Sequence, residues 1–333
     1  MSTLVSFVVP IYNEEENVRL LYQELSDVAR DGGIRAEFIF IDDGSRDETP
    51  VRLREVADSD ERVKVIELRR NFGQTAAMAA GFDYCDGEIV VTLDGDLQND
   101  PHEVPRMIQK LEEGYDIVAG WRKNRQDKVL SRIIPSMIAN RIISKTTKVT
   151  LHDYGCSLKV FRAEVVKNIK LYGEMHRFIP AVAAQMGVKI CEIPVNHRAR
   201  QFGVSKYGIS RTLRVILDLL TVQFFLGFAT RPLHLFGMLG LGTGALGTLL
   251  LAVLSFERLV LGVPLSNRPI LLVGVMLVLI GLQFICSGLL AEVLVRTYHE
   301  SQGKKIYTVR NVYRRSNSTG VNDDRAGVRV ISS

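Results

Sequence analysis

The sequence predicts an α/β head domain, followed by two transmembrane helices and a polar tail. Within residues 1–209, apolar runs of strand length alternate with helical patterns, as in β-α units that build a parallel sheet covered by helices. Residues 233–292 are almost continuously apolar, and residues 293–333 are polar again. The 333-residue chain therefore divides into a soluble part and a membrane part.

The head contains five apolar runs that we expect to be strands: VSFVVP, EFIFID, VKVIEL, EIVVTLD and YDIVAG. The segments between them have helical patterns, at residues 14–29, 48–57, 74–84 and 101–111. Ligands of parallel sheets bind at the carboxyl ends of the strands. The polar residues expected at that edge are Asn13, Glu14, Asp42, Asp43, Asp94 and Asp96.

The sequence LDGDLQ follows the fourth expected strand and contains a DxD pattern. Asp94 and Asp96 are two residues apart, so in an extended chain their side chains point the same way, and Gly95 leaves room between them. Carboxylate oxygens suit Mg²⁺ or Mn²⁺. Such a cation could neutralise the charge that develops on a departing nucleotide diphosphate.

Two apolar segments have the length of membrane-spanning helices, at residues 233–256 and 270–292. At 1.5 Å per residue the first reaches about 36 Å, enough to cross a hydrocarbon core of ~30 Å. Buried core helices are the alternative, which the length and succession of the two segments disfavour. Gly240 and Gly244 in the first, and Gly274, Gly281 and Gly288 in the second, are typical of close-packing faces, on each other or on another subunit.

The flanks of this helix pair carry more basic residues than the loop at residues 257–269, which has two arginines. By the positive-inside rule we expect the loop outside the cytoplasm and both termini inside, with the protein in the cytoplasmic (inner) membrane. Residues 210–232 mix charges with long apolar runs, which predicts amphipathic helices in the membrane interface. A third crossing is the alternative.

Composition excludes several other classes of protein. The net charge is +5, but the basic residues are dispersed without a nucleic-acid-binding signature. The four cysteines form no CxxC pair, which favours reduced thiols over a disulfide or zinc site. The tail segment KKIYTVRNVYRR predicts a strand or hairpin that pairs with the head or with a neighbouring chain, and we favour a homo-oligomer.

Six ordered motifs cover the head nearly from end to end: VVPIYNEEENV, FIFIDDGSRDET, RRNFGQTAAMAAG, LDGDLQNDP, YDIVAGWR and RQFGVSKYG. With them the chain resembles glycosyltransferase family 2, in its polyprenyl-phosphate branch of GtrB-like and dolichol-phosphate mannose synthase-like enzymes. The resemblance implies a GT-A head with a Rossmann-like mixed sheet. It also implies an inverting hexosyltransferase that uses a nucleotide sugar, a divalent cation and a polyprenyl phosphate.

The resemblance also implies roles for particular residues. Asp94, Asp96 and Gln98 would lie at the metal and diphosphate, and Gly73 would let the backbone approach the nucleotide. Asp153 would orient the acceptor or the sugar. The alternative is a loop carboxylate that forms an ion pair with a local arginine or lysine. The nucleotide pocket would be lined by Pro10, Tyr12, Glu14 and Asp42, and the phosphates would be bound by Arg122, Arg132, Arg200 and Lys206.

The two-helix pattern of the resembling enzymes favours UDP-glucose as donor and undecaprenyl phosphate as acceptor, with GDP-mannose and dolichol phosphate as the alternative. A processive polysaccharide synthase would carry a QxxRW motif, whereas the only tryptophan, Trp121, lies in AGWR. A non-catalytic nucleotide-sugar sensor is an alternative of another class. The complete DxD pattern and the basic motifs favour the enzyme.

Overall fold

The computed structural model describes residues 3–123, 150–169, 171, 175–184, 186–199, 232–262, 264, 268–301 and 305–315. The chain divides into two compact units. One, called the head here, contains the described residues up to 199 except residue 150, together with residues 306–315. The other contains the two long apolar helices.

Within the described residues, eight strands form one mixed sheet in the order β7-β5-β6-β4-β1-β2-β3-β8. Strands β1 to β4 are mutually parallel, β6 runs antiparallel to both β4 and β5, and β7 is parallel to β5. The strands are β1 Leu4–Ile11, β2 Arg35–Asp42, β3 Val63–Leu68, β4 Ile89–Thr92, β5 Ile117–Trp121, β6 Lys159–Arg162, β7 Ile190–Pro194 and β8 Val309–Arg314.

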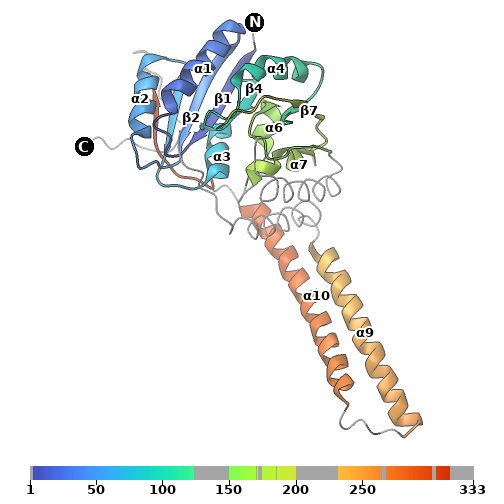
Figure 1. Ribbon diagram of the computed structural model, residues 1–333. Helices are drawn as coiled ribbons and strands as arrows, with labels where there is room; N and C mark the ends of the chain where they lie inside the picture. Colours follow the sequence, from blue (N-terminus) through green and yellow to red (C-terminus); the bar gives the residue numbers. More distant parts are fainter. Residues whose placement is uncertain are drawn as a thin grey trace. The chain divides into compact units, whose positions relative to one another are not determined.

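Helices cover both faces of the sheet (Figure 1). Alternate side chains of a strand point to opposite faces, so Phe7 and Phe38 join one core cluster while Val8 and Ile39 join the other. The first cluster receives α1 Val18–Asp31, α2 Thr49–Ser59 and α4 Val104–Glu112, the last preceded by the short η1 Pro101–Glu103. The second receives α3 Gln74–Tyr84, α6 Ala163–Asn168, η3 Met175–Phe178 and α7 Ile179–Ala184. Burial on both faces explains why these strands are continuous apolar runs.

The architecture confirms the α/β class and the mixed sheet that the resemblance implied. Two strands were not expected: β6 lies between β4 and β5, and β7 extends the sheet beyond β5. Helix α1 begins at Val18 rather than at residue 14, because Glu14 to Asn17 form a turn in which Asn17 N donates to Glu14 O at 2.9 Å. Glu14 therefore lies in the loop after β1.

Two apolar helices follow, α9 Pro232–Val260 and α10 Pro269–Ser301, as predicted. Their stretches Phe236–Val260 and Pro269–Ala291 are long and apolar enough to cross a membrane. The helices pack on each other through glycines: a Cβ on Gly240 would lie 2.6 Å from the carbonyl oxygen of Gly281, and one on Gly247 would lie 2.8 Å from that of Gly274. The glycine faces therefore pack within the chain. The expected interfacial helices at 210–232 fall almost wholly outside the described residues, which resume at Pro232, the first residue of α9.

The tail strand β8 pairs antiparallel with β3 of its own chain. Tyr307 is buried just before it, and its hydroxyl donates to Asp83 Oδ2 at 2.5 Å. Asn311 donates to Glu67, and the Arg54 guanidinium stacks over the Tyr313 ring. The tail segment therefore forms a strand whose partner is the head, and this pairing gives no support to the homo-oligomer, which stays a prediction.

Candidate active site

The loop after β1 begins the site at the carboxyl edge of the sheet. Pro10 lies in β1, and Tyr12 and Glu14 follow the strand. Asn13 has a φ of 52°, a left-handed conformation that asparagine tolerates better than most residues. Its amide donates to Ser45 Oγ at 2.9 Å, and that of Glu14 donates to Thr49 Oγ1 at 2.9 Å. The loop after β1 is thereby fixed to the loop after β2.

Asp42, the last residue of β2, and Asp43, which follows it, organise the neighbouring loops. Asp42 is buried and accepts a hydrogen bond from the Ser45 amide, and desolvation raises the pKa of its carboxyl group. Asp43 accepts from the amides of Phe72 and Gly73 at 2.7 and 2.9 Å. Burial raises the pKa of Asp43 to about 6. Gly73 has a φ of 93° and directly precedes α3, and nothing lies within 4 Å of where its Cβ would be.

The loop after β4 carries the DxD pair. Asp94 Oδ1 accepts from Gln74 Nε2 at 2.6 Å, and Asp94 Oδ2 accepts from Ser157 Oγ at 2.7 Å. The Asp94 amide donates to Asn99 Oδ1 at 3.1 Å. Asp96 is buried, and its Oδ1 accepts from the Gln98 amide at 3.2 Å. Both carboxylates are thus oriented by hydrogen bonds from their own loop and from α3 and the segment before β6.

The donor set of this loop fits a hard divalent cation. Desolvation first, and the nearby charge of Asp96 second, raise the pKa of Asp94. A bound cation would offset that repulsion and that desolvation. A carboxylate oxygen has two lone pairs, so the hydrogen bonds made by Asp94 leave acceptor capacity for a metal. Oxygen ligands of this kind are typical of Mg²⁺ and Mn²⁺ sites.

Arg122 and Asp153, both singled out from the sequence, form one buried pair. Arg122 Nε lies 2.7 Å from Asp153 Oδ2 and Arg122 Nη2 lies 2.9 Å from Oδ1, with the side chains 12% and 4% exposed. Glu192 on β7 accepts from the amides of His152 and Asp153, and the His152 ring stacks on Trp121 at 4.4 Å between centroids. Asp153 is thus paired with an arginine 31 positions away in the sequence rather than with a basic residue of its own loop, and its proposed role in orienting the acceptor or the sugar stays a prediction.

Several polar residues of the site were missed by the sequence reasoning: Gln74, Asn99, Ser157 and Lys159. Lys159 on β6 is buried, donates to the carbonyl of Cys156, and has a pKa lowered by desolvation. Gln74 lies within one of the quoted motifs, at the start of α3, and Ser157 lies four residues after Asp153. The contact of Ser157 with Asp94 depends on the position of β6, which directly follows Ser157 and Leu158. Arg132, Arg200 and Lys206 lie outside the described residues.

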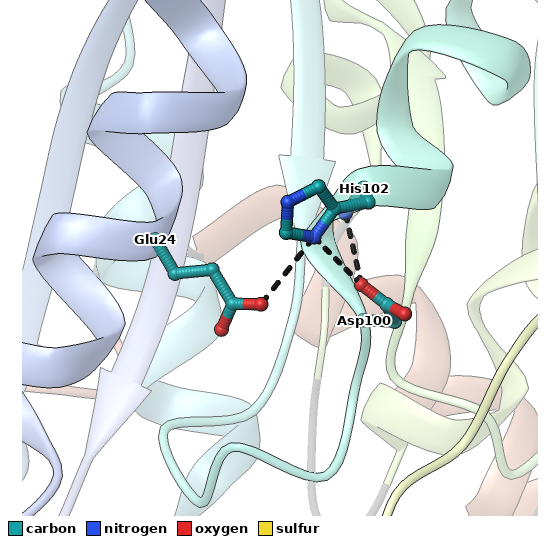
Figure 2. A group of neighbouring side chains, drawn as sticks. All are labelled: Glu24, Asp100 and His102. Carbon is teal, nitrogen blue, oxygen red and sulfur yellow. Dashed lines mark hydrogen bonds and ion pairs between the residues drawn. The ribbon is translucent and has the colours of Figure 1, made fainter.

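A second group of metal-ligand residue types lies beside this loop. Figure 2 shows Glu24 on α1, with Asp100 and His102 after β4. The His102 Nδ1 atom lies 3.4 Å from Glu24 Oε1 and 3.0 Å from Asp100 Oδ1. Arg198 contacts the same two carboxylate oxygens, each at 2.6 Å. The cluster is therefore an ion-pair network whose oxygens already bind a guanidinium.

Known proteins match both the sequence and the fold. The family model for glycosyl transferase family 2 matches residues 6–170. The chain is 50% identical over 313 residues to the dodecaprenyl-phosphate galacturonate synthase of Rhizobium johnstonii, covering 93% of each chain. The chain belongs to glycosyl transferase family 2. Within it, the undecaprenyl-phosphate 4-deoxy-4-formamido-L-arabinose transferase of Klebsiella pneumoniae is 35% identical over 324 residues, covering 97% of each chain.

A solved structure shares the fold. The glucosyl-3-phosphoglycerate synthase of Mycobacterium tuberculosis, in complex with Mn²⁺, uridine diphosphate and phosphoglyceric acid, superposes with a TM-score of 0.51 at 18% identity. The match covers 66% of this chain and 78% of that one. This likeness confirms the GT-A type of head.

These comparisons identify the chain as a polyprenyl-phosphate sugar transferase, which confirms the enzyme prediction. Its two apolar helices indicate a membrane protein, and so do the names of the relatives, which contain the lipids dodecaprenyl phosphate and undecaprenyl phosphate. The relatives name galacturonate and formamido-arabinose, so the expectation of UDP-glucose has no support from them.

Proposed function

We propose that this family 2 enzyme transfers a uronic acid, galacturonate, from a uridine diphosphate sugar to a polyprenyl phosphate. The observation that carries the proposal is the 50% identity, over nearly the whole chain, to an enzyme named for dodecaprenyl-phosphate galacturonate. Galacturonate replaces glucose, the sugar favoured from the sequence, because the names of these relatives do not include glucose. Formamido-arabinose is the second candidate sugar, supported by the 35% identical relatives.

The DxD carboxylates would hold a divalent cation, Mg²⁺ or Mn²⁺, with Gln98 beside them. When bound, such a cation supplies positive charge that stabilises the departing diphosphate. Asp94 and Asp96 are already oriented for this role by their hydrogen bonds with Gln74, Ser157 and the Gln98 amide. Preorganised ligands avoid the cost of rearrangement during the reaction.

The nucleotide would be bound by the loops after β1, β2 and β3. We assign to it Pro10, Tyr12, Glu14 and Asp42, as the family resemblance implies. Gly73, directly before α3, has no side chain, and nothing lies within 4 Å of where its Cβ would be, which supports close approach of a ligand to the backbone there. The first turn of α3 offers amides that suit an anion.

The acceptor phosphate needs no strong general base. The second pKa of a phosphate monoester is about 6, so its attacking oxygen is largely ionised at neutral pH. The site must instead hold two anionic phosphates together, and we assign this task to Arg122, Arg132, Arg200 and Lys206. Asp153 would act through Arg122, whose guanidinium it fixes by two hydrogen bonds. The displacement at the anomeric carbon would invert its configuration.

We further propose that the head and both termini are cytoplasmic. The apolar helices lie in sequence between β7 and β8, and both strands belong to the same sheet. An even number of membrane crossings between them is therefore required. This supports two crossings, and the excess of basic residues in the flanks supports the cytoplasmic side.

A donor and acceptor panel tests the proposal. The purified full chain is offered labelled UDP-galacturonate, UDP-formamido-arabinose, UDP-glucose and GDP-mannose, each with undecaprenyl or dodecaprenyl phosphate, and lipid-extractable label is measured. We expect label from UDP-galacturonate, and a loss of roughly 100-fold in Asp96→Asn. Asp31→Asn, at the exposed end of α1, is the matched control and should be unchanged. Label from another sugar alone would refute galacturonate, and no label from any pair would refute the transferase.

A further inference from the structure

Arg198 links three parts of the head beside the DxD loop. Its Nη1 atom lies 2.6 Å from Glu24 Oε1 on α1, and its Nη2 atom lies 2.6 Å from Asp100 Oδ1 after β4. The side chains of Arg198, Glu24 and Asp100 are 30%, 18% and 13% exposed. Figure 2 shows that both carboxylates are also directed at the His102 ring, whose Nδ1 atom lies 3.4 Å from Glu24 Oε1 and 3.0 Å from Asp100 Oδ1. Such partly buried, charge-assisted hydrogen bonds are stronger than those between exposed side chains.

The backbone around Arg198 also pairs with the DxD loop. The Arg198 amide donates to the carbonyl of Gln98 at 2.8 Å, and Gln98 Nε2 donates to the carbonyl of Arg198 at 3.4 Å. Asn99 and His197 form an antiparallel bridge. Asn196 Nδ2 donates to Asp100 Oδ2 at 3.0 Å. Residues 196–198 therefore lie antiparallel to residues 98–100, although about a hundred positions separate them in the sequence.

The DxD loop needs such external support. Leu97, directly after Asp96, has a φ of 60°, a left-handed conformation that a bulky residue adopts only under constraint. A strained conformation persists where the surrounding structure holds it in place. Gln98 and Asp100, which follow Leu97, are the residues that Arg198 contacts. The contacts of Arg198 are therefore placed to keep the loop in its strained conformation.

We propose that Arg198 is a positioning residue, whose ion pairs with Glu24 and Asp100 hold the DxD loop in the conformation that binds a divalent cation with the nucleotide diphosphate. The inference rests on the proposed role of Asp94 and Asp96. Arg198 acts through the loop and needs no contact with the substrate. Lysine cannot replace it fully, because an ammonium group lacks the planar fork that reaches two carboxylates at once.

The test measures binding of UDP with Mn²⁺ by titration calorimetry on the full chain in detergent, with unfolding temperature recorded in parallel. We expect Arg198→Ala to weaken binding about tenfold, the loss that corresponds to one charge-assisted hydrogen bond. Arg198→Lys should lie between the parent and Arg198→Ala. Glu24→Gln should weaken binding less than Arg198→Ala, because Asp100 still pairs with Arg198.

Arg19→Ala is the matched control, since Arg19 lies on α1 like Glu24 and forms an exposed ion pair with Glu55 on α2. A purely structural role for Arg198 would lower the unfolding temperature and the fraction of protein that binds, while the affinity of the bound fraction stayed at the parent value. That result, or an affinity equal to that of Arg19→Ala, would overturn the proposal. A parent chain that does not bind UDP with Mn²⁺ would refute the proposed function itself, and this inference with it.

Discussion

Removing one partner of the buried Arg122–Asp153 pair should destabilise the head strongly. Asp153→Ala leaves the Arg122 guanidinium, only 12% exposed, without its bidentate partner. An uncompensated buried charge costs about 3–5 kcal/mol. A domain of roughly 200 residues loses about 2–4 °C in unfolding temperature per kcal/mol, so we expect a decrease on the order of 10 °C.

The chain offers its own probe for this measurement. Trp121 is the only tryptophan, and its ring stacks on His152, the residue before Asp153. Intrinsic fluorescence during thermal unfolding therefore reports on the neighbourhood of the pair. Glu55→Ala, which removes an exposed ion pair with Arg19, is the control and should leave the unfolding temperature unchanged.

A double variant separates stability from catalysis. Replacing both partners, as Arg122→Met with Asp153→Leu, removes the unpaired charge and should restore most of the unfolding temperature. Sugar transfer should remain at least about 100-fold below the parent if Arg122 binds phosphate as proposed, because its positive charge is gone. A folded double variant with parental activity would refute the proposed phosphate-binding role of Arg122. A small shift in Asp153→Ala would refute the reasoning on buried charge.

Three further predictions concern the head. Gly73→Ala should lower the free energy of unfolding by about 1–3 kcal/mol, because alanine is strained at its φ of 93°, and it should also weaken UDP binding. Gly187→Ala, at a φ of 78° away from the site, should lower the free energy of unfolding without weakening UDP binding. Chemical unfolding measures the first quantity and calorimetry the second. Tyr307→Phe should lose about 1 kcal/mol with the hydrogen bond to Asp83, seen as a lower denaturant midpoint. Burial raises the pKa of Asp43 to about 6 in the folded chain, whereas in the unfolded chain this carboxyl group ionises near pH 4. Between about pH 4 and 6 its contribution to stability therefore falls as the pH rises. Asp43→Asn should flatten that slope when the free energy of unfolding is measured against pH.

The sequence predicted those elements whose signal is local. Helix α3 spans Gln74–Tyr84, the range expected from its pattern, because a glycine with positive φ precedes it and Cys85 after it is extended. Strand β6 was missed because it has only four residues, Lys159–Arg162, with a charged residue at each end. Its insertion between β4 and β5 is a tertiary arrangement that no local pattern encodes.

The site divides in the same way. Asp42 and Asp94 could be found because they follow strong strand patterns, and the carboxyl ends of parallel strands meet at one edge. The pairing of Arg122 with Asp153 and the contact of Arg198 with Glu24 could not be found. Both link distant segments, and each charge taken singly looks like a solvated surface residue. Ser157 was missed for the same reason, since its contact with Asp94 depends on β6.

The position of β8 adds a topological constraint that hydropathy alone does not supply. The sequence of residues 210–232 allowed a third membrane crossing as an alternative to interfacial helices. An apolar stretch with charges near its start is compatible with either. Strand β8 follows α10, yet it pairs with β3 over residues that include Ile66 and Val312. Three crossings would put β3 and β8 on opposite sides of the bilayer, where they could not share backbone hydrogen bonds. Two crossings satisfy the sheet, so the pairing of β8 with β3 requires an even number of membrane spans and disfavours a third crossing.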